Sequence, residues 1–329
     1  MAAEHTPQTL LAAIRYYSDL DVCQSLLVEA RWPDGVTCPT CGSKAVSYLE
    51  NQRRWQCREK HSRRQFSVKV GTIFEDSPIR LDKWFTAMWL IAGAKNGISS
   101  YELHRAIGVT QKTAWFMLHR IRLAMHTGTF RKLSGQVEAD ETFIGGKARN
   151  MHKGRRERML KGRQSGSTGK IAVMGVLERN SAGGNSVVRT EVVSGVKRRN
   201  LQYELRKHVQ MDGETVLYSD ALKSYVPVTP RGWRPSDLYI HKVIDHAEKY
   251  VDGEVHTNGM ENFWSLLKRM IKGTYVSVEP FHLFRYLDEE AYRFNNRKDT
   301  DAGRFAGVLK AVTGRRVMYK ELIGEKQPA

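Results

Sequence analysis

The sequence predicts an α/β protein in which a mixed sheet with flanking helices is preceded by a small metal-binding module and a helical module. The sheet is indicated by a β, β, β, α, β order of segments, at residues 137–144, 170–179, 185–193, about 197–210 and 215–218. Two close pairs of potential metal ligands near the N-terminus indicate the first module, and helical periodicity over residues 82–126 indicates the second.

The chain is strongly basic. Its 53 Lys and Arg residues outnumber 35 Asp and Glu residues, which gives a net charge of +18 spread along most of the sequence. Such a charge attracts polyanions, of which nucleic acid is the usual one, although charge alone does not distinguish a nucleic-acid-binding protein from a merely soluble basic one. No stretch approaches the ~20 apolar residues of a membrane span, and the start MAAEHTPQTL lacks the pattern of a signal peptide. We therefore expect a cytoplasmic, nucleoid-associated protein without a membrane partner.

The metal-binding module is expected to hold structural zinc. Its four candidate ligands form two pairs, Cys38 with Cys41 and Cys57 with His61. This spacing is typical of a tetrahedral site of three thiolates and one imidazole, in which no position is left open for a reacting water. The remaining cysteine, Cys23, lies in an amphipathic helical segment at 19–30, where core packing is its expected role. Cys23 in place of His61 is the weaker alternative for the fourth ligand.

The helical module reads as three helices with the features of a helix-turn-helix. The last two helices are joined at Gly108–Val109, and the third begins after Thr110. Its first turn carries Gln111, Lys112 and Thr113, where a recognition helix presents side chains to base edges. The alternative is an ordinary small helical bundle.

Two aspartates stand out in the predicted sheet. Asp140 lies inside the segment VEADETFIGGK, which also holds Glu138 and Glu141, and Asp220 ends the strand ETVLYSD. An unpaired carboxylate buried at a strand end costs several kcal/mol, so burial does not explain these residues.

A third acid lies on a predicted amphipathic helix. The segment HTNGMENFWSLLKR has an apolar face that includes Met260, Trp264 and Leu267, and a polar face that includes Glu261 and Lys268. Three carboxylates from two strands and a helix would repel each other unless divalent cations lay between them. Oxygen ligands of this kind select Mg²⁺ or Mn²⁺, and a pair of such ions supports phosphodiester displacement.

Taken together, the motifs resemble one family. They are CPTCGS, RRQFSVKVGTIFEDS, VEADETFIGGK, YSDALKSY, HTNGMENFWSLLKR with IKGTY, and RYLDEEAYRFNNR, which together extend from about residue 15 to residue 297. In their order and spacing the chain resembles the DDE insertion-sequence transposases of the ISXO-type group. These combine an N-terminal zinc ribbon and a helix-turn-helix with a ribonuclease-H-like catalytic domain.

The resemblance implies roles for individual positions. The first aspartate of the family falls on Asp140, the second on Asp220, the glutamate on Glu261 and the lysine that follows in many such enzymes on Lys268. The third acid has competitors, namely Asn258 and Asn262 close by and Glu289 and Glu290 further along the chain. Where a second Cys-x-x-Cys would stand, this chain has Cys57 and His61, so the departure concerns the fourth zinc ligand.

The resemblance also implies a reaction and partners. The protein would bind the terminal inverted repeats of an insertion sequence, cleave the ends and join the 3′-OH to target DNA, with two Mg²⁺ or Mn²⁺ ions and as a homodimer or larger assembly. A basic loop at 145–170 contains nine Lys or Arg residues, and its Arg155 and Arg156 are expected DNA contacts. The alternatives are a DNA-binding regulator that performs no chemistry and a nuclease of the same fold that cuts without joining.

The expected domain boundaries follow from these motifs. An N-terminal helix and zinc ribbon occupy 1–76, the helix-turn-helix 77–130, the catalytic domain 131–300, and a C-terminal helix and tail 301–329. A closing helix after Pro280 is expected to face the sheet with side chains that include Phe281 and Phe284.

Overall fold

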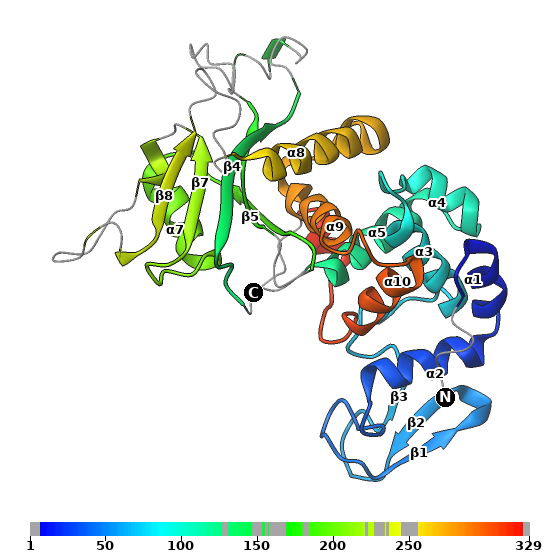
Figure 1. Cartoon of the computed structure of the whole chain (residues 1–329). Coiled ribbons are helices and arrows are strands. Elements are labelled where there is room, and N and C mark those ends of the chain that lie inside the picture. Colours follow the sequence, from blue (N-terminus) through cyan, green and yellow to red (C-terminus); the bar gives the residue numbers. More distant parts are fainter. Residues whose placement is uncertain are drawn as a thin grey trace. The chain divides into compact units, whose positions relative to one another are not determined.

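The chain forms two compact units, made of Met1–His126 with Asp299–Ala329 and of Thr127–Lys298 (Figure 1). The computed structural model describes residues 7–126, 131–146, 153–154, 157, 169–179, 184–220, 223–226, 234, 237–244 and 256–324. Within these residues, no helix is both long and apolar enough to cross a membrane.

The second unit is built on a five-stranded mixed sheet with the order β6-β5-β4-β7-β8. Its strands are β4 (Gln136–Ile144), β5 (Ile171–Glu178), β6 (Val187–Val193), β7 (Val216–Asp220) and β8 (Ile240–Ile244). The first three strands pair antiparallel, whereas β4 pairs parallel with β7 and β7 parallel with β8. β8 was not predicted from the sequence.

Helices cover both faces of this sheet, which confirms the predicted fold class (Figure 1). On one face, α8 (Asn258–Met270) and α9 (Leu283–Asn295) pack on side chains of β5 and β6. On the other face lies α7 (Arg198–His208), whose Leu201 and Leu205 are fully buried. Because alternate residues of a strand point to opposite faces, each residue of β4 belongs either to the α8 side or to the α7 side.

The first unit contains a three-stranded antiparallel ribbon and a group of helices. The ribbon strands are β1 (Val46–Leu49), β2 (Arg54–Cys57) and β3 (Gln65–Phe66). The helices are α1 (Leu10–Tyr17), α2 (Leu20–Arg31), α3 (Leu81–Gly93), α4 (Ser100–Ile107), α5 (Gln111–Met125), α10 (Asp301–Lys310) and the short α11 (Tyr319–Leu322). This agrees with the small metal-binding and helical modules predicted from the sequence.

Local signals fix the ends of α4 and α5. Ser99 and Glu102 form a reciprocal capping box at the start of α4, and Gly108 ends the helix with φ 62°. The Thr110 side chain accepts a hydrogen bond from the Thr113 amide at the start of α5. Glycine tolerates the left-handed conformation that stops a helix, and Thr supplies an acceptor for an unsatisfied N–H, so the sequence encodes this helix–turn–helix connection directly.

The C-terminal segment packs within the first unit. The Phe305 ring of α10 stacks on Tyr17 of α1 with centroids 4.9 Å apart, and it also contacts Phe85 and Trp89 of α3. The expected division had set residues 301–329 apart as a C-terminal helix and tail. Contacts formed over such a long sequence separation explain why local patterns did not reveal this packing.

The prediction for the helix after Pro280 was partly wrong. Leu287, Ala291 and Phe294 are buried in the core as expected, but Phe281 and Phe284 are 53% and 43% exposed. Pro280 starts a short 3-10 turn before α9 begins at Leu283, and this changes which residues face the sheet. Leu283 is buried in their place.

Candidate active site and zinc-ribbon cluster

The pairing of β4 with β7 brings two aspartates to one face of the sheet. Val137 pairs with Leu217 and Glu138 with Tyr218 in a parallel register. Continued by two residues, this register places Asp140 next to Asp220, on neighbouring strands about 4.8 Å apart. Both residues are partly buried.

Asp140 is held by two donors and surrounded by negative charge. Its Oδ1 accepts a hydrogen bond from the Glu141 amide at 2.8 Å, and its Oδ2 accepts one from Trp264 Nε1 of α8 at 2.9 Å. Burial, followed by the charges of Asp220 and Glu261, raises the pKa of Asp140 to about 6 despite these hydrogen bonds. Asp220 and Glu261 therefore lie near enough to Asp140 for their charges to act on it.

Helix α8 carries Glu261 and lies directly on the sheet. Its apolar face is buried, with Met260, Phe263 and Trp264 all at most 4% exposed, while Glu261 is partly buried. The helix approaches β5 at Gly175, the residue paired with Asp140. A Cβ atom at Gly175 would lie 2.2 Å from Met260 Cε and 2.7 Å from the Trp264 ring, so only glycine permits this approach.

Glu141 belongs to the opposite face of β4, the side of Tyr225. Burial and the charges of Asp140 and Asp220 raise its pKa to about 8. The Tyr225 side chain is fully buried there, and its pKa is raised by burial and by Glu141. Of the two neighbouring acids, Asp140 is therefore the one that shares the α8 face with Asp220.

The donor set suits divalent cations. The charges of Asp220 and Glu261 help to raise the pKa of Asp140, and a bound Mg²⁺ or Mn²⁺ would relieve this repulsion. Among the described residues, these three acids do not form a group whose ligand atoms all lie within 4.8 Å of one another. Such a spacing is too wide for all three side chains, in these positions, to bind one Mg²⁺ at about 2.1 Å.

The other candidates for the third acid differ in their surroundings. Glu289 accepts hydrogen bonds from Arg293 and from the Tyr275 hydroxyl, and Glu290 accepts one from Arg293 at 2.6 Å. Both glutamates are at most 3% exposed, so these buried ion pairs occupy them. Asn258 and Asn262 are exposed on α8. Lys268, two turns after Glu261 on the same helix, is partly buried.

The four predicted zinc ligands converge in the ribbon. All four ligand atoms lie within 4.8 Å of one another, with Cys38 Sγ 3.4 Å from His61 Nε2 and Cys41 Sγ 3.6 Å from Cys57 Sγ. A tight turn shapes the first pair, because the Gly42 amide donates to the Cys38 carbonyl and Gly42 has φ 75°. This arrangement fits one tetrahedral zinc ion.

The thiols of the cluster differ in acidity. Burial would raise the pKa of Cys38, but hydrogen bonds from the Cys41 and Thr40 amides lower it to about 7. Burial raises the pKa of Cys57 to about 11. To bind zinc, the Cys57 thiol would have to lose its proton. Cys23 lies apart from the cluster in α2, fully buried, with its thiol donating to the Tyr17 carbonyl, as expected for a packing role.

The predicted recognition residues lie in the first turn of α5. Gln111 Nε2 donates to Ser100 Oγ at 2.8 Å, and Thr113 Oγ1 lies 2.8 Å from Thr110 Oγ1. The Lys112 ammonium lies 4.5 Å above the ring of Tyr319 in α11, a contact that the sequence did not suggest. Arg155 and Arg156 lie outside the described residues.

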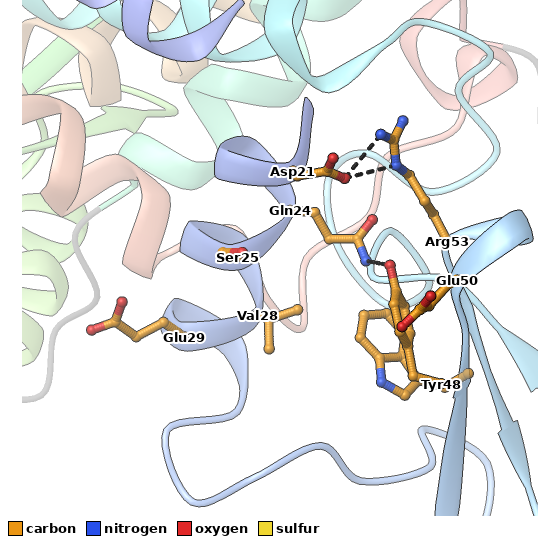
Figure 2. Close-up of a pocket in the computed structure, with 9 residues that line it drawn as sticks. Asp21, Gln24, Ser25, Val28, Glu29, Tyr48, Glu50 and Arg53 are labelled. Atoms are coloured by element: carbon orange, nitrogen blue, oxygen red, sulfur yellow. Dashed lines mark hydrogen bonds and ion pairs between the residues drawn. The ribbon is translucent and has the colours of Figure 1, made fainter. Parts of the chain in front are cut away.

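A hollow of about 650 Å³ separates α2 from the ribbon strands. Figure 2 shows Asp21 and Gln24 of α2 bonded across it to Arg53 and Tyr48. Three carboxylates line this hollow, those of Asp21, Glu29 and Glu50, against the single guanidinium of Arg53. Their charge repels phosphate, so this face of the ribbon is unsuited to a nucleic-acid backbone.

Sequence reasoning missed two residues that organise the acidic site. Trp264 was expected only as part of an apolar face, yet its N–H bonds to Asp140. Glu138 was noted only as a member of the acidic segment, yet it is 1% exposed and bonded to Arg179 and to the start of α8. The available signal was the alternation of β4, which places Glu138 and Asp140 on the same face.

Comparison with known proteins finds matches for both modules of the chain. Residues 132–295 match the ISXO2-like transposase domain, and residues 19–61 match the transposase zinc-ribbon domain. The chain is also 29% identical over 255 residues to an uncharacterized protein in transposable element ISH50 of Halobacterium salinarum, covering 75% of this chain and 81% of the relative. The chain therefore contains an ISXO2-like DDE transposase domain, with a transposase zinc ribbon ahead of it.

Proposed function

We propose that the protein binds the terminal inverted repeats of an insertion sequence, cleaves the ends and joins the resulting 3′-OH to target DNA. One observation carries the proposal within the transposase family. Asp140 lies on the central strand of the sheet, and its pKa is raised in part by the charges of Asp220, on a second strand, and of Glu261, on α8. A DNA-binding regulator has no need for such a cluster of acids.

The three carboxylates would hold a pair of Mg²⁺ or Mn²⁺ ions, which supply charge stabilisation at the attacking and leaving oxygens of phosphoryl transfer. Asp140 is oriented for this role by the Glu141 amide and by Trp264. Lys268 lies two turns after Glu261 on the same side of α8, where its ammonium can bind a phosphate of the DNA. The same groups serve cleavage by water and attack by a 3′-OH, since both are in-line displacements at phosphorus.

DNA recognition is assigned to the first unit and to the basic loop. Gln111, Lys112 and Thr113 in the first turn of α5 would face base edges and phosphates, beyond the short connection that ends at Thr110. Arg155 and Arg156 would bind phosphates close to the acidic site, because their loop follows the strand that carries Asp140. The net charge of +18 supports this assignment.

The reaction implies an assembly and a location. Joining two ends of an element requires that both be held together, so we propose a homodimer or larger complex on DNA. Access to chromosomal DNA places the protein in the cytoplasm with the nucleoid. Zinc has a structural role in this scheme, because its four ligands all come from the protein.

The direct test is incubation of the purified protein with an oligonucleotide that carries the terminus of the flanking element, with and without Mg²⁺. We expect strand cleavage and joining only with the metal. Asp220→Asn and Glu261→Gln should abolish the joining of pre-cut ends to target DNA. Joining by either variant would contradict the mechanism. Cleavage without joining would indicate a nuclease, and binding without either reaction would indicate a regulator.

A further inference from the structure

Glu138 is a buried carboxylate on the α8 face of β4, two residues before Asp140. It is 1% exposed, and both of its oxygens have donors. Arg179 Nε donates to Oε1 at 2.7 Å, and the Met260 amide donates to Oε2 at 2.8 Å. With both oxygens used in this way, Glu138 is not available as a further metal ligand.

The bond to Met260 replaces a helix cap. Thr257 precedes α8 but makes no capping hydrogen bond with its side chain. The first amides of a helix have no partner within the helix, and a carboxylate there also interacts favourably with the helix dipole. Glu138 thus satisfies the third amide of α8 from a strand that lies 122 residues earlier in the sequence.

Arg179 extends the contact to the segment before α8. Its Nη2 lies 2.9 Å from His256 Nδ1 and also donates to the His256 carbonyl. Because a guanidinium only donates, His256 Nδ1 is the acceptor in this contact. The guanidinium also lies 4.2 Å above the ring of Tyr218 on β7. One arginine therefore joins Glu138, β7 and the entry to α8.

Glycine at two positions keeps this contact close. A Cβ atom at Gly259 would lie 2.9 Å from Glu138 Oε2, and one at Gly175 would collide with Met260 and Trp264. The absence of side chains at both points lets the start of α8 rest on β4 and β5.

We propose that Glu138, with Arg179, is a positioning clamp that sets the start of α8 against β4 and so places Glu261 opposite Asp140 before any metal binds. This inference rests on the proposed function for its catalytic meaning. Outer groups that orient metal ligands affect metal affinity although they do not touch the ion. The clamp would thus lower the free-energy cost of holding Asp140, Asp220 and Glu261 on the α8 face of the sheet.

Glu178 provides a matched control in the same sheet. It is also a buried carboxylate, 3% exposed, that accepts from an arginine, Arg131 at 2.7 Å, and from a backbone amide, Ser134 at 3.0 Å. These two bonds tie the end of β5 to the segment before β4. Glu138→Gln and Glu178→Gln therefore remove similar interactions from the sheet, but only the first removes the clamp.

The experiment measures hydrogen exchange of the α8 amides and Mn²⁺ affinity in full-length protein without DNA. In Glu138→Gln, we expect exchange at Met260 to become roughly tenfold faster and Mn²⁺ affinity to fall roughly tenfold. Glu178→Gln should leave both values at the wild-type level. Unchanged exchange and affinity in Glu138→Gln, or equal losses in Glu178→Gln, would overturn the proposal.

A second variant covers the case in which Glu138→Gln does not fold. Alanine favours helices more than glycine does, but the methyl group of Gly259→Ala would crowd the Glu138 carboxylate. We therefore expect this variant to loosen the start of α8. Slower exchange at Met260 in this variant would contradict the clamp. If the wild type bound no Mn²⁺ at all, the proposed function would fail, whereas the exchange data would still decide whether the clamp exists.

Discussion

Trp264 donates a hydrogen bond from its indole N–H to Asp140 Oδ2 across 2.9 Å, which joins a buried helix residue to the central acid of the site. The indole is 4% exposed and rests over Gly175, so its position is fixed by packing. A side chain expected only to fill the core therefore also orients a carboxylate.

Replacement of Trp264 by Phe tests this relationship. Phe keeps most of the apolar contact but has no N–H, so Asp140 loses one of its two donors. We expect Mn²⁺ affinity to fall about tenfold while the fold is retained, as measured by calorimetric titration and circular dichroism. Trp89→Phe, in α3 of the other unit, is the control and should bind Mn²⁺ like the wild type. Equal affinities in all three proteins would contradict the role of the N–H.

The ribbon is expected to depend on zinc. Cys57→Ser removes one of four convergent ligands and should reduce bound zinc from about one equivalent to near zero, with lower thermal stability of the ribbon. Cys23→Ser is the control because Cys23 lies outside the cluster. Metal analysis of the purified variants checks both. Full zinc content in Cys57→Ser would instead point to another set of ligands.

The acidic site predicts a pH dependence of stability in the metal-free protein. The pKa of Glu141 is raised to about 8, so the folded state holds a proton that the unfolded state has lost above about pH 4.5. This group therefore lowers the free energy of unfolding as pH rises from about 4.5 to about 8. Glu141→Gln should be more stable than the wild type at about pH 8, by an amount on the order of a few kcal/mol, and similar at about pH 5. Denaturant titrations in EDTA provide the measurement.

The opposite sign is expected at Glu191 on β6. The neighbouring His208 imidazole and the Lys207 ammonium lower its pKa to about 2, so its charged form stabilises the fold. Glu191→Gln should be less stable than the wild type at neutral pH, and the difference should vanish as pH falls from about 4 to about 2. If Glu191→Gln were instead more stable than the wild type at neutral pH, the charged form of Glu191 would not stabilise the fold.

The basic loop predicts a salt effect. Arg155→Ala and Arg156→Ala should each weaken binding to DNA of any sequence and reduce the slope of log affinity against log salt by about 0.9, since each phosphate contact releases counterions. Arg53→Ala is the control, because Arg53 pairs with Asp21 in the acid-lined hollow. Fluorescence anisotropy at several salt concentrations supplies the slopes. Unchanged slopes would indicate that these two arginines do not contact DNA phosphates.

Much of the architecture was predictable because its signals are local. The Cys and His spacing of the ribbon, the caps at Ser99 and Thr110, and the apolar face of α8 are each encoded within a few residues. The acids Asp140 and Asp220 were found because a carboxylate is out of place on a buried strand.

What the sequence did not reveal depends on distant contacts. The packing of Phe305 on Tyr17 and the bond from Glu138 to the Met260 amide join residues that no local pattern links. β8 carries polar residues, including His241 and Lys242, and gives little hydrophobic signal. The apolar spacing also assigned Phe281 and Phe284 to the sheet face, whereas Phe281 lies in a 3-10 turn and Leu283 is the residue that is buried.

The central claim is that Asp140, Asp220 and Glu261 act as one divalent-metal site. The most direct measurement is calorimetric titration of Mn²⁺ into the wild type and into Asp140→Asn, with Glu178→Gln as a buried-acid control. We expect Mn²⁺ to bind saturably to the wild type and to the control. In Asp140→Asn, Mn²⁺ binding should be lost while the fold stays intact. Binding of equal affinity in Asp140→Asn would contradict it.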